Sequence, residues 1–182
     1  MKSEILHLLR HADGYVSGQQ LCETFGVSRT AVWKVINQLK EEGYVIDSVQ
    51  NKGYRITEYP DIITASEIES LLLDDSGNMQ GICRHIQYFD KTDSTNNQAK
   101  LAAEKNAPEG TLFVAECQTG GRGRRGKTWE SPAGSGIWMS LLLRPDISPE
   151  SASMLTLVLA VAMVDAINEE VQDAKCYVKW PN

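Results

Sequence analysis

The sequence lacks the features of secreted proteins, of proteins stabilised by a structural metal ion, and of membrane-spanning proteins. It has only four cysteines, which lie too far apart for a zinc-binding C-x-x-C pair, and it shows no signal peptide. The most apolar run, M-L-T-L-V-L-A-V-A-M-V at residues 154–164, is far shorter than the roughly 20 residues that cross a bilayer. We therefore expect reduced thiols, a cytoplasmic location, no membrane partner, and a buried core helix at 154–164.

The sequence also lacks a surplus of positive charge, because its net charge is −6. Residues 1–57 carry 7 Lys and Arg against 6 Asp and Glu, a net charge of +1, whereas residues 58–182 carry 11 against 18, a net charge of −7. Any nucleic-acid binding therefore belongs to the first third of the chain. The apolar fraction of 42% is ordinary for a globular chain of one or two domains.

The first third has the pattern of a winged helix-turn-helix. Apolar periodicity predicts three short helices, of which the second and third begin at the capping residues Ser17 and Ser28. The third helix stops at Gly43, and two short strands are expected at 45–50 and 54–57 around a tight turn. The apolar stripe of the third helix consists of Val32, Val35, Ile36 and Leu39.

The third helix is a candidate DNA-recognition helix, since the N-terminal half of such a helix enters the major groove. The wing would bring its cations to the phosphates. The alternative is a winged helix that contacts protein, and a net charge of +1 is low for a DNA-binding domain. Trp33 lies on the expected exposed face of the third helix, and we expect it to pack rather than to touch a base. The candidate DNA-binding residues are Ser28, Arg29, Thr30, Lys34 and Asn37 on the helix and Lys52 and Arg55 on the wing.

A second domain follows a short linker. Residues 58–63 break the apolar periodicity, and a Thr64–Glu67 capping box then opens another helix. We therefore divide the chain into a winged-helix domain at 1–57, a linker at 58–63 and a second domain at 64–182.

The segment D-S-T-N at residues 93–96 lies between a predicted strand at 86–90 and a predicted helix. Small polar side chains and free backbone N–H groups gather at such a junction, which suits ligand binding. Ordinary helix capping is the alternative, and a Thr95–Gln98 capping box would serve it.

The segment T-G-G-R-G-R-R-G-K-T-W at residues 119–129 matches the dinucleotide fingerprint, the P-loop and the kinase glycine loop at once. The first two patterns deliver phosphate to the start of a helix. Here Pro132, Gly134 and Gly136 follow, and a buried strand is expected at 137–143, so no helix can begin. The kinase pattern lacks its later H-R-D and D-F-G motifs. None of the three assignments holds.

What remains is a glycine-framed loop between two buried strands, with the cations Arg122, Arg124, Arg125 and Lys127. Burying several like charges is costly unless an anion with several oxygens neutralises them. Trp129 follows the loop and could stack on a base. The loop therefore predicts a site for a nucleoside phosphate.

Three motifs in this order, D-S-T-N, E-C-Q-T-G-G-R-G-R-R-G-K-T-W and V-K-W-P-N, resemble those of the bifunctional biotin–protein ligases that are also biotin operon repressors. The resemblance covers the whole chain. It implies an α+β fold, with an N-terminal winged helix followed by part of a mixed sheet and flanking helices, as in class II aminoacyl-tRNA synthetases and the biotin and lipoate ligases. We also expect a long helix at 150–171 and a strand at 176–180.

The resemblance also assigns residues to the ligand site and leaves the metal ligands open. The implied catalytic residues are Arg122, Arg124 and Lys179. The implied biotin-binding residues are Ser94, Thr95, Asn96, Gln118, Arg122, Gly123 and Arg124. The implied ATP-binding residues are Arg122, Arg125, Trp129, Lys179 and Asn182.

By the same resemblance, the protein uses ATP and Mg²⁺ to form biotinoyl-AMP and transfers biotin to a lysine of biotin carboxyl carrier protein. The adenylate would also be the corepressor, favouring a homodimer that binds two half-sites of operator DNA. Two alternatives stay open: a transcription factor that senses the ligand without ligating it, and a lipoate-type ligase. The family continues beyond K-W-P-N, so we expect residues 1–182 alone to be inactive.

Overall fold

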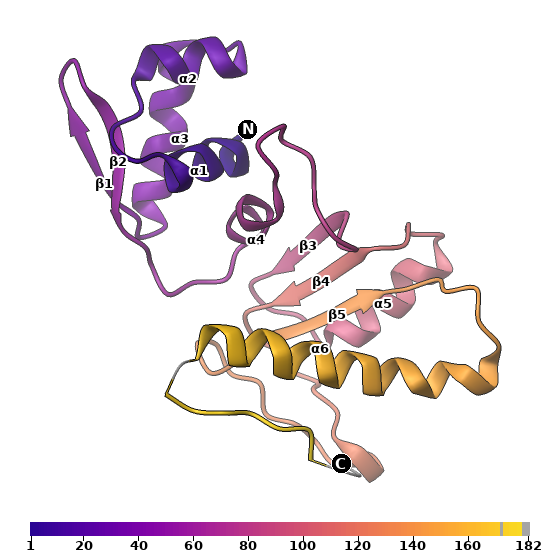
Figure 1. Cartoon of the computed structure of the whole chain (residues 1–182). Coiled ribbons are helices and arrows are strands. Elements are labelled where there is room, and N and C mark those ends of the chain that lie inside the picture. The colour runs from indigo at the N-terminus through magenta and orange to yellow at the C-terminus, as the bar shows by residue number, and fades with distance from the viewer. Residues whose placement is uncertain (172, 180–182) are drawn as a thin grey trace. The chain divides into compact units, whose positions relative to one another are not determined.

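The computed structural model describes residues 1–171 and 173–179, apart from the side chain of Arg124. The chain divides into two compact units, Met1–Leu143 and Arg144–Asn182. Figure 1 shows the N-terminal helices with their two-stranded wing, a three-stranded sheet and one long helix. The first unit contains both the winged helix and the sheet.

A winged helix-turn-helix occupies the first part of the chain, as the sequence predicts. Serine caps begin two of its helices: Ser17 Oγ accepts the Gln20 N–H at 3.0 Å, and Ser28 Oγ accepts the Ala31 N–H at 3.2 Å. The predicted apolar stripe of the third helix is buried in one core with side chains of the first. The elements are α1 (Lys2–His11), α2 (Gly18–Phe25), α3 (Arg29–Glu41), β1 (Val45–Val49) and β2 (Gly53–Glu58).

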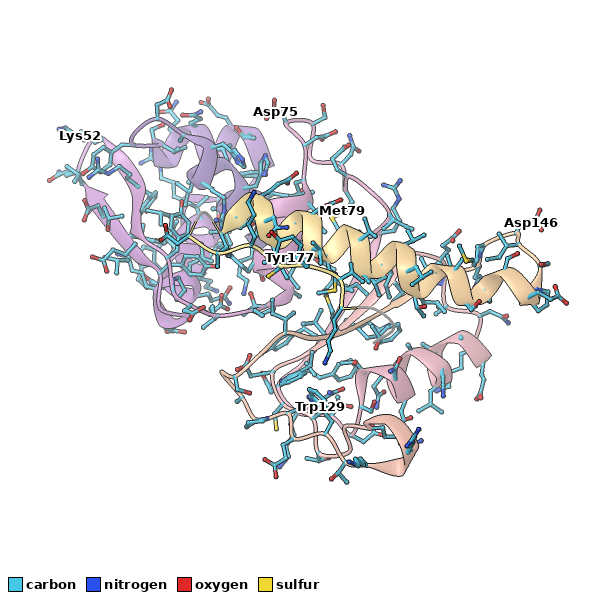
Figure 2. All side chains as sticks on the ribbon, turned by 60° about the horizontal axis from the view of Figure 1, so that its bottom comes forward. Lys52, Asp75, Met79, Trp129, Asp146 and Tyr177 are labelled. Carbon is cyan, nitrogen blue, oxygen red and sulfur yellow. The ribbon has the colours of Figure 1, made fainter. Side chains whose placement is uncertain are left out.

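The wing is an antiparallel hairpin that is fastened to the helices. Val16 and Tyr54 exchange two backbone hydrogen bonds of 2.9 Å in an isolated β-bridge. This close approach requires glycine at position 53, because a Cβ there would lie 2.0 Å from the Val16 carbonyl oxygen and φ is +113°. Lys52 therefore lies at the tip of a hairpin whose base is held in place (Figure 2).

Helix α4 (Ala65–Leu72) packs against α1. Thr64 caps it as predicted, since Thr64 Oγ1 accepts the Glu67 N–H at 3.1 Å. The Glu67 carboxylate does not complete a capping box. It accepts instead from the Arg10 guanidinium at 2.5 Å and from the Tyr44 hydroxyl, so tertiary partners replace the local one.

The second sheet is mixed, in agreement with the expected α+β class. Its strand order is β3-β4-β5, with β3 parallel to β4 and β4 antiparallel to β5. Helix α5 connects the two parallel strands and packs against β4 and β5. Residues 113–115 of the central strand are buried. The elements are β3 (His85–Phe89), α5 (Thr95–Glu104), β4 (Thr111–Ala115) and β5 (Trp138–Leu142).

The predicted helix at 150–171 forms, but it begins as a 3₁₀ turn, Pro149–Ser153, before α6 (Met154–Glu170). The expectation that it is buried is wrong, since no residue of α6 is buried. A unit of this size has too little surface to cover a helix that is apolar all round. By length and composition alone, Pro149–Glu170 could cross a membrane, a property that core helices of soluble proteins share.

The strand predicted at 176–180 is also wrong over its described part, because residues 173–179 form no strand. The Asn168 side chain instead forms hydrogen bonds with both backbone groups of Cys176. Its Oδ1 accepts the Cys176 N–H at 2.7 Å, and its Nδ2 donates to the Cys176 carbonyl at 3.1 Å. A strand needs these groups for its ladder partner. Residue 180 lies outside the described residues.

Candidate ligand-binding site

The site is built where the two parallel strands end. After β3, Thr92 and Asp93 offer backbone carbonyls to the segment after β4. The Thr119 N–H donates to Thr92 at 2.9 Å, and the Gly120 N–H donates to Asp93 at 2.7 Å. A Cβ at Gly120 would lie 3.1 Å from the Asp93 oxygen, so a larger residue would press the two segments apart. This joint holds the D-S-T-N segment beside the glycine loop.

A cavity of about 450 Å³ lies at this joint. It brings together six residues that the sequence assigned to a ligand, and six more that it did not. The unassigned group includes Ile137 and the first two residues of β5, all of which belong to the strand predicted at 137–143. The lining consists of Ser94, Thr95, Asn96, Gln118, Arg122 and Trp129 from the predicted set, with Asn97, Lys100, Gly121, Ile137, Trp138 and Met139.

Gln118 is bonded at both ends of its amide. Its Oε1 accepts the Thr95 backbone N–H at 2.8 Å and the Thr95 hydroxyl at 3.2 Å, while its Nε2 donates to Ser131 Oγ at 3.2 Å. The predicted Thr95–Gln98 capping box is therefore wrong. Ser94 is the N-cap of α5, without a side-chain cap bond, and Gln98 donates to Asp93.

A second polar chain runs from α5 to β5. The hydroxyls of Thr95 and Ser140 are 2.9 Å apart, and Ser140 Oγ lies 3.2 Å from Asn96 Oδ1. Because Thr95 is 4% exposed, both of its polar groups depend on protein partners for their hydrogen bonds when no ligand is bound. Thr95 thus links the ends of β4, α5 and β5.

The Asp93 carboxylate organises the first turn of α5. It accepts from the Asn97 amide at 2.6 Å, the Gln98 amide at 2.9 Å and the Thr92 hydroxyl at 3.2 Å. These bonds, with that of Asn97 the largest contributor, lower the pKa of Asp93 to about 2. Asn97 lines the cavity, so Asp93 orients a ligand-facing side chain.

The glycine loop is a short hairpin rather than the start of a helix. The Trp129 N–H donates to Gly121 at 2.9 Å, and the Gly123 N–H donates to Lys127 at 2.7 Å. The tip is a 3₁₀ turn, Arg124–Gly126, with Arg125 at φ 57°. The next element along the described chain is β5. The exclusion of a P-loop and of a dinucleotide turn is therefore confirmed.

The loop presents its cations to solvent. Arg122 lines the cavity and is exposed, as are Arg125 and Lys127. None of the three forms an ion pair with a described carboxylate. Trp129, which is 58% exposed, also faces the cavity. Uncompensated cations and an exposed indole beside a polar cavity suit an anionic, aromatic ligand.

Five predicted ligand residues are not among the described residues that line this cavity. Gly123 and Arg125 belong to the glycine loop beyond Arg122 and are not part of the lining. The side chain of Arg124 and the whole of Asn182 lie outside the described residues. Lys179 is exposed and belongs to the second unit.

The candidate DNA-binding residues lie at the N-cap of α3, along α3 and on the wing. Arg29 and Lys52 line a cavity of about 520 Å³ there. Ser28, Thr30 and Lys34 are exposed, and Asn37 is half-buried.

Two residues of this region, Trp33 on α3 and Arg55 on the wing, have surroundings of their own. Trp33 lies on the exposed face of α3, as expected, away from the buried stripe. Its side chain is 57% exposed, so the expectation that it packs is wrong. Arg55 has partners of its own, with its guanidinium 3.6 Å from the Asp47 carboxylate and 5.0 Å from the centre of the Tyr15 ring.

Comparison with known proteins gives two family matches. Residues 2–55 match an HTH domain, and residues 88–182 match the biotin/lipoate A/B protein ligase family. The whole chain is 42% identical to the bifunctional ligase/repressor BirA of Bacillus subtilis and covers 54% of it. Over 98% of the chain, identity to BirA of Escherichia coli is 34%, and 52% of that protein is covered. The chain spans about half the length of these curated relatives.

Among solved structures, a biotin protein ligase from Aquifex aeolicus in complex with biotin and ATP aligns with 54% of this chain and 40% of its own. The sequence identity is 36% and the TM-score is 0.45.

Proposed function

Because the chain belongs to the biotin/lipoate A/B protein ligase family, we propose that it serves an ATP-dependent biotin–protein ligase that also represses transcription in response to biotin. The observation that carries the ligase half is the cavity at the end of β4. The hydrogen-bonded Thr95–Gln118 pair lines this cavity of about 450 Å³ together with Arg122 and Trp129. This volume lies within the range of small-molecule sites.

The cavity has two kinds of lining that match two parts of biotin. Ser94, Thr95, Asn96 and Gln118 supply donors and acceptors for the ureido ring, which carries two N–H groups and a carbonyl. The run at residues 137–139 supplies apolar and aromatic surface for the sulfur ring and the alkyl chain. Gly123 lets the loop backbone approach a bound ligand closely.

The proposed reaction has two steps. The biotin carboxylate attacks the α-phosphorus of ATP and displaces pyrophosphate, giving biotinoyl-AMP. A lysine amine of biotin carboxyl carrier protein then attacks the acyl carbon and displaces AMP. In this proposal Arg122, Arg124 and Lys179 stabilise the charge at the α-phosphate, while Arg125, Trp129 and Asn182 hold the nucleotide. No protein nucleophile is needed.

Mg²⁺ is a further part of the proposal, and the described residues offer it no site of their own. No three His, Cys, Asp or Glu side chains among them converge on one point. Mg²⁺ commonly enters enzymes bound to substrate phosphates, with few protein ligands. We therefore assign no residue to the metal.

The repressor half rests on the winged helix. Exposed Arg29 and Thr30 at the start of α3 would enter the major groove of operator DNA, and Lys52 would contact a phosphate. The adenylate would act as corepressor by favouring a homodimer that spans two half-sites in the cytoplasm. The HTH match over residues 2–55 and the relatives named ligase/repressor support this assignment.

Titration calorimetry on the complete protein tests the ligand. Biotin should bind, while lipoate and octanoate should give no heat. Tight binding of lipoate would instead assign the protein to the lipoate side of the family. Footprinting on the promoter of a biotin-synthesis operon tests the proposed repressor activity. If the DNA is not protected when biotin and ATP are present, the proposed repressor activity is wrong.

A further inference from the structure

The amide of Gln118 has only one orientation that fits its surroundings. The backbone N–H of Thr95 lies 2.8 Å from one end of this amide and can only donate, so that end must be the oxygen. The nitrogen consequently faces Ser131 Oγ at 3.2 Å, and Ser131 must accept. The Thr95 hydroxyl lies 3.2 Å from the same oxygen and can donate to it.

Ser131 is itself held firmly. It is 2% exposed, and its carbonyl accepts the Gln118 backbone N–H at 3.0 Å. Gly121 approaches it from the loop so closely that a Cβ at position 121 would lie 2.9 Å from Ser131 Oγ. Ser131 does not line the 450 Å³ cavity, whereas Gln118 does. The hydrogen bond through which its hydroxyl reaches a lining side chain is the one with Gln118.

We propose that Ser131 is a positioning residue of the ligand site. Its hydroxyl accepts one N–H of Gln118 and so keeps the amide oxygen toward Thr95. The amide therefore has its binding orientation before a ligand arrives. This inference rests on the proposed biotin site for its binding readout, but the bond between Ser131 and Gln118 exists without any ligand.

The first measurement needs no ligand and no substitution. Hydrogen exchange of the Gln118 side-chain amide, followed by NMR in the complete protein, should show one protected Nε2 proton. Ser131→Ala should abolish that protection. Ser135→Ala is the matched control: Ser135 is an exposed serine of the same segment whose hydroxyl donates to Pro132 at 2.7 Å. An unprotected Gln118 amide in the unsubstituted protein would overturn the proposal, whatever the protein binds.

The second measurement is a double-mutant cycle on biotin affinity, with Gln118→Met as the second change. Loss of one neutral hydrogen bond corresponds to about 2- to 12-fold in Kd, and Ser131→Ala should weaken binding by that factor. In the Gln118→Met background the same change should have no effect, because no amide is left to orient.

An equal loss in both backgrounds would mean that Ser131 only fills space, and no loss in either would mean that the bond is irrelevant to binding. Both results overturn the proposal. A protein that binds no biotin while its Gln118 amide remains protected would instead contradict the proposed function and leave the positioning role of Ser131 standing.

Discussion

At the scale of single residues, close backbone approach explains why the loop contains glycine where it does. A Cβ at Gly121 would lie 2.3 Å from the Trp129 carbonyl oxygen and 2.9 Å from Ser131 Oγ. Neither neighbour can move easily, because one is backbone and the other is buried. By contrast, a Cβ at Gly14 meets no atom within 4 Å.

We therefore predict that Gly121→Ala lowers the free energy of unfolding by about 1–3 kcal/mol, in the range of overpacked sites. It should also weaken ligand binding, since it separates the loop from Gln118. Thermal melting and calorimetry check this, with Gly14→Ala as the control. A melting temperature equal to that of the unsubstituted protein would show that the loop relaxes around the added methyl group.

Asp93 supplies a prediction about pH. Its hydrogen bonds, that of Asn97 first, hold its pKa near 2, below the ordinary value of about 3.9. Because the folded-state pKa is depressed, the stabilisation it gives is present above about pH 4 and is lost as the pH falls toward 2. A carboxyl ¹³C titration should find the midpoint near 2, and Asn97→Ala should raise it. A midpoint unchanged by Asn97→Ala would contradict the assigned cause.

Residue-level prediction from the sequence succeeded where chemistry is local. The serine caps and the cations of the loop follow from side-chain type and spacing. It failed at Thr95, because Gln118, 23 residues away, accepts from the two groups of Thr95 that a capping box would use. Ser131 gave no signal, since its role comes from a contact with Gln118, 13 residues away.

At the scale of elements, the two cations of the wing have different surroundings. Lys52 lies at the hairpin tip, 5.8 Å from the Tyr15 ring and without a carboxylate partner among the described residues. Arg55 is 3.6 Å from Asp47 and 5.0 Å from the same ring. Lys52 is thus the freer of the two to neutralise a phosphate.

We predict that Lys52→Ala weakens binding to all DNA sequences alike and reduces the salt slope by about 0.9. Arg29→Ala should instead blur the preference for the operator over other sequences. Anisotropy titrations at several salt concentrations separate the two outcomes. If Lys52→Ala leaves the slope intact, the wing does not touch the phosphates.

Helix α4 provides the second element-scale prediction. Glu67 joins it to the winged helix through Arg10 and Tyr44, and the Arg10 guanidinium also lies 4.5 Å from the centre of the Tyr59 ring. Burial, and next the bond to Glu67, raise the pKa of Tyr44. The paired Arg10 and Glu67 side chains are 19% and 17% exposed.

Removing the carboxylate by Glu67→Gln should cost about 2–3 kcal/mol of stability, less than the 3–5 kcal/mol of a fully buried pair because some solvent reaches it. Glu69→Gln on the same helix is the control, since Glu69 forms no ion pair with a described residue. Denaturant unfolding measures both variants. Equal effects would show that the contact between α1 and α4 depends on packing rather than on this pair.

At the scale of the whole molecule, the sequence predicts the architecture better than the environment of its parts. Helix α6 was expected from its apolar run, yet burial depends on which surfaces meet it, and periodicity cannot supply that for a helix apolar all round. The segment at 176–179 shows the same limit, because the Asn168 side chain decides its hydrogen bonding. Strands with alternating apolar residues and helices with capping residues can, in contrast, be predicted from the local sequence alone.

The division of the chain gives the last prediction. The core of the winged helix is drawn from residues 5–46, so a fragment of residues 1–57 should fold alone. Helix α4 adds the Glu67 contacts and a 2.8 Å bond between His7 Nδ1 and the carbonyl of the fully buried Ser70.

A fragment of residues 1–75 should therefore unfold at higher denaturant than 1–57, and Glu67→Gln should remove part of the difference. Chevron or equilibrium unfolding of the three fragments is the test. Identical midpoints for 1–57 and 1–75 would mean that α4 does not stabilise the DNA-binding domain.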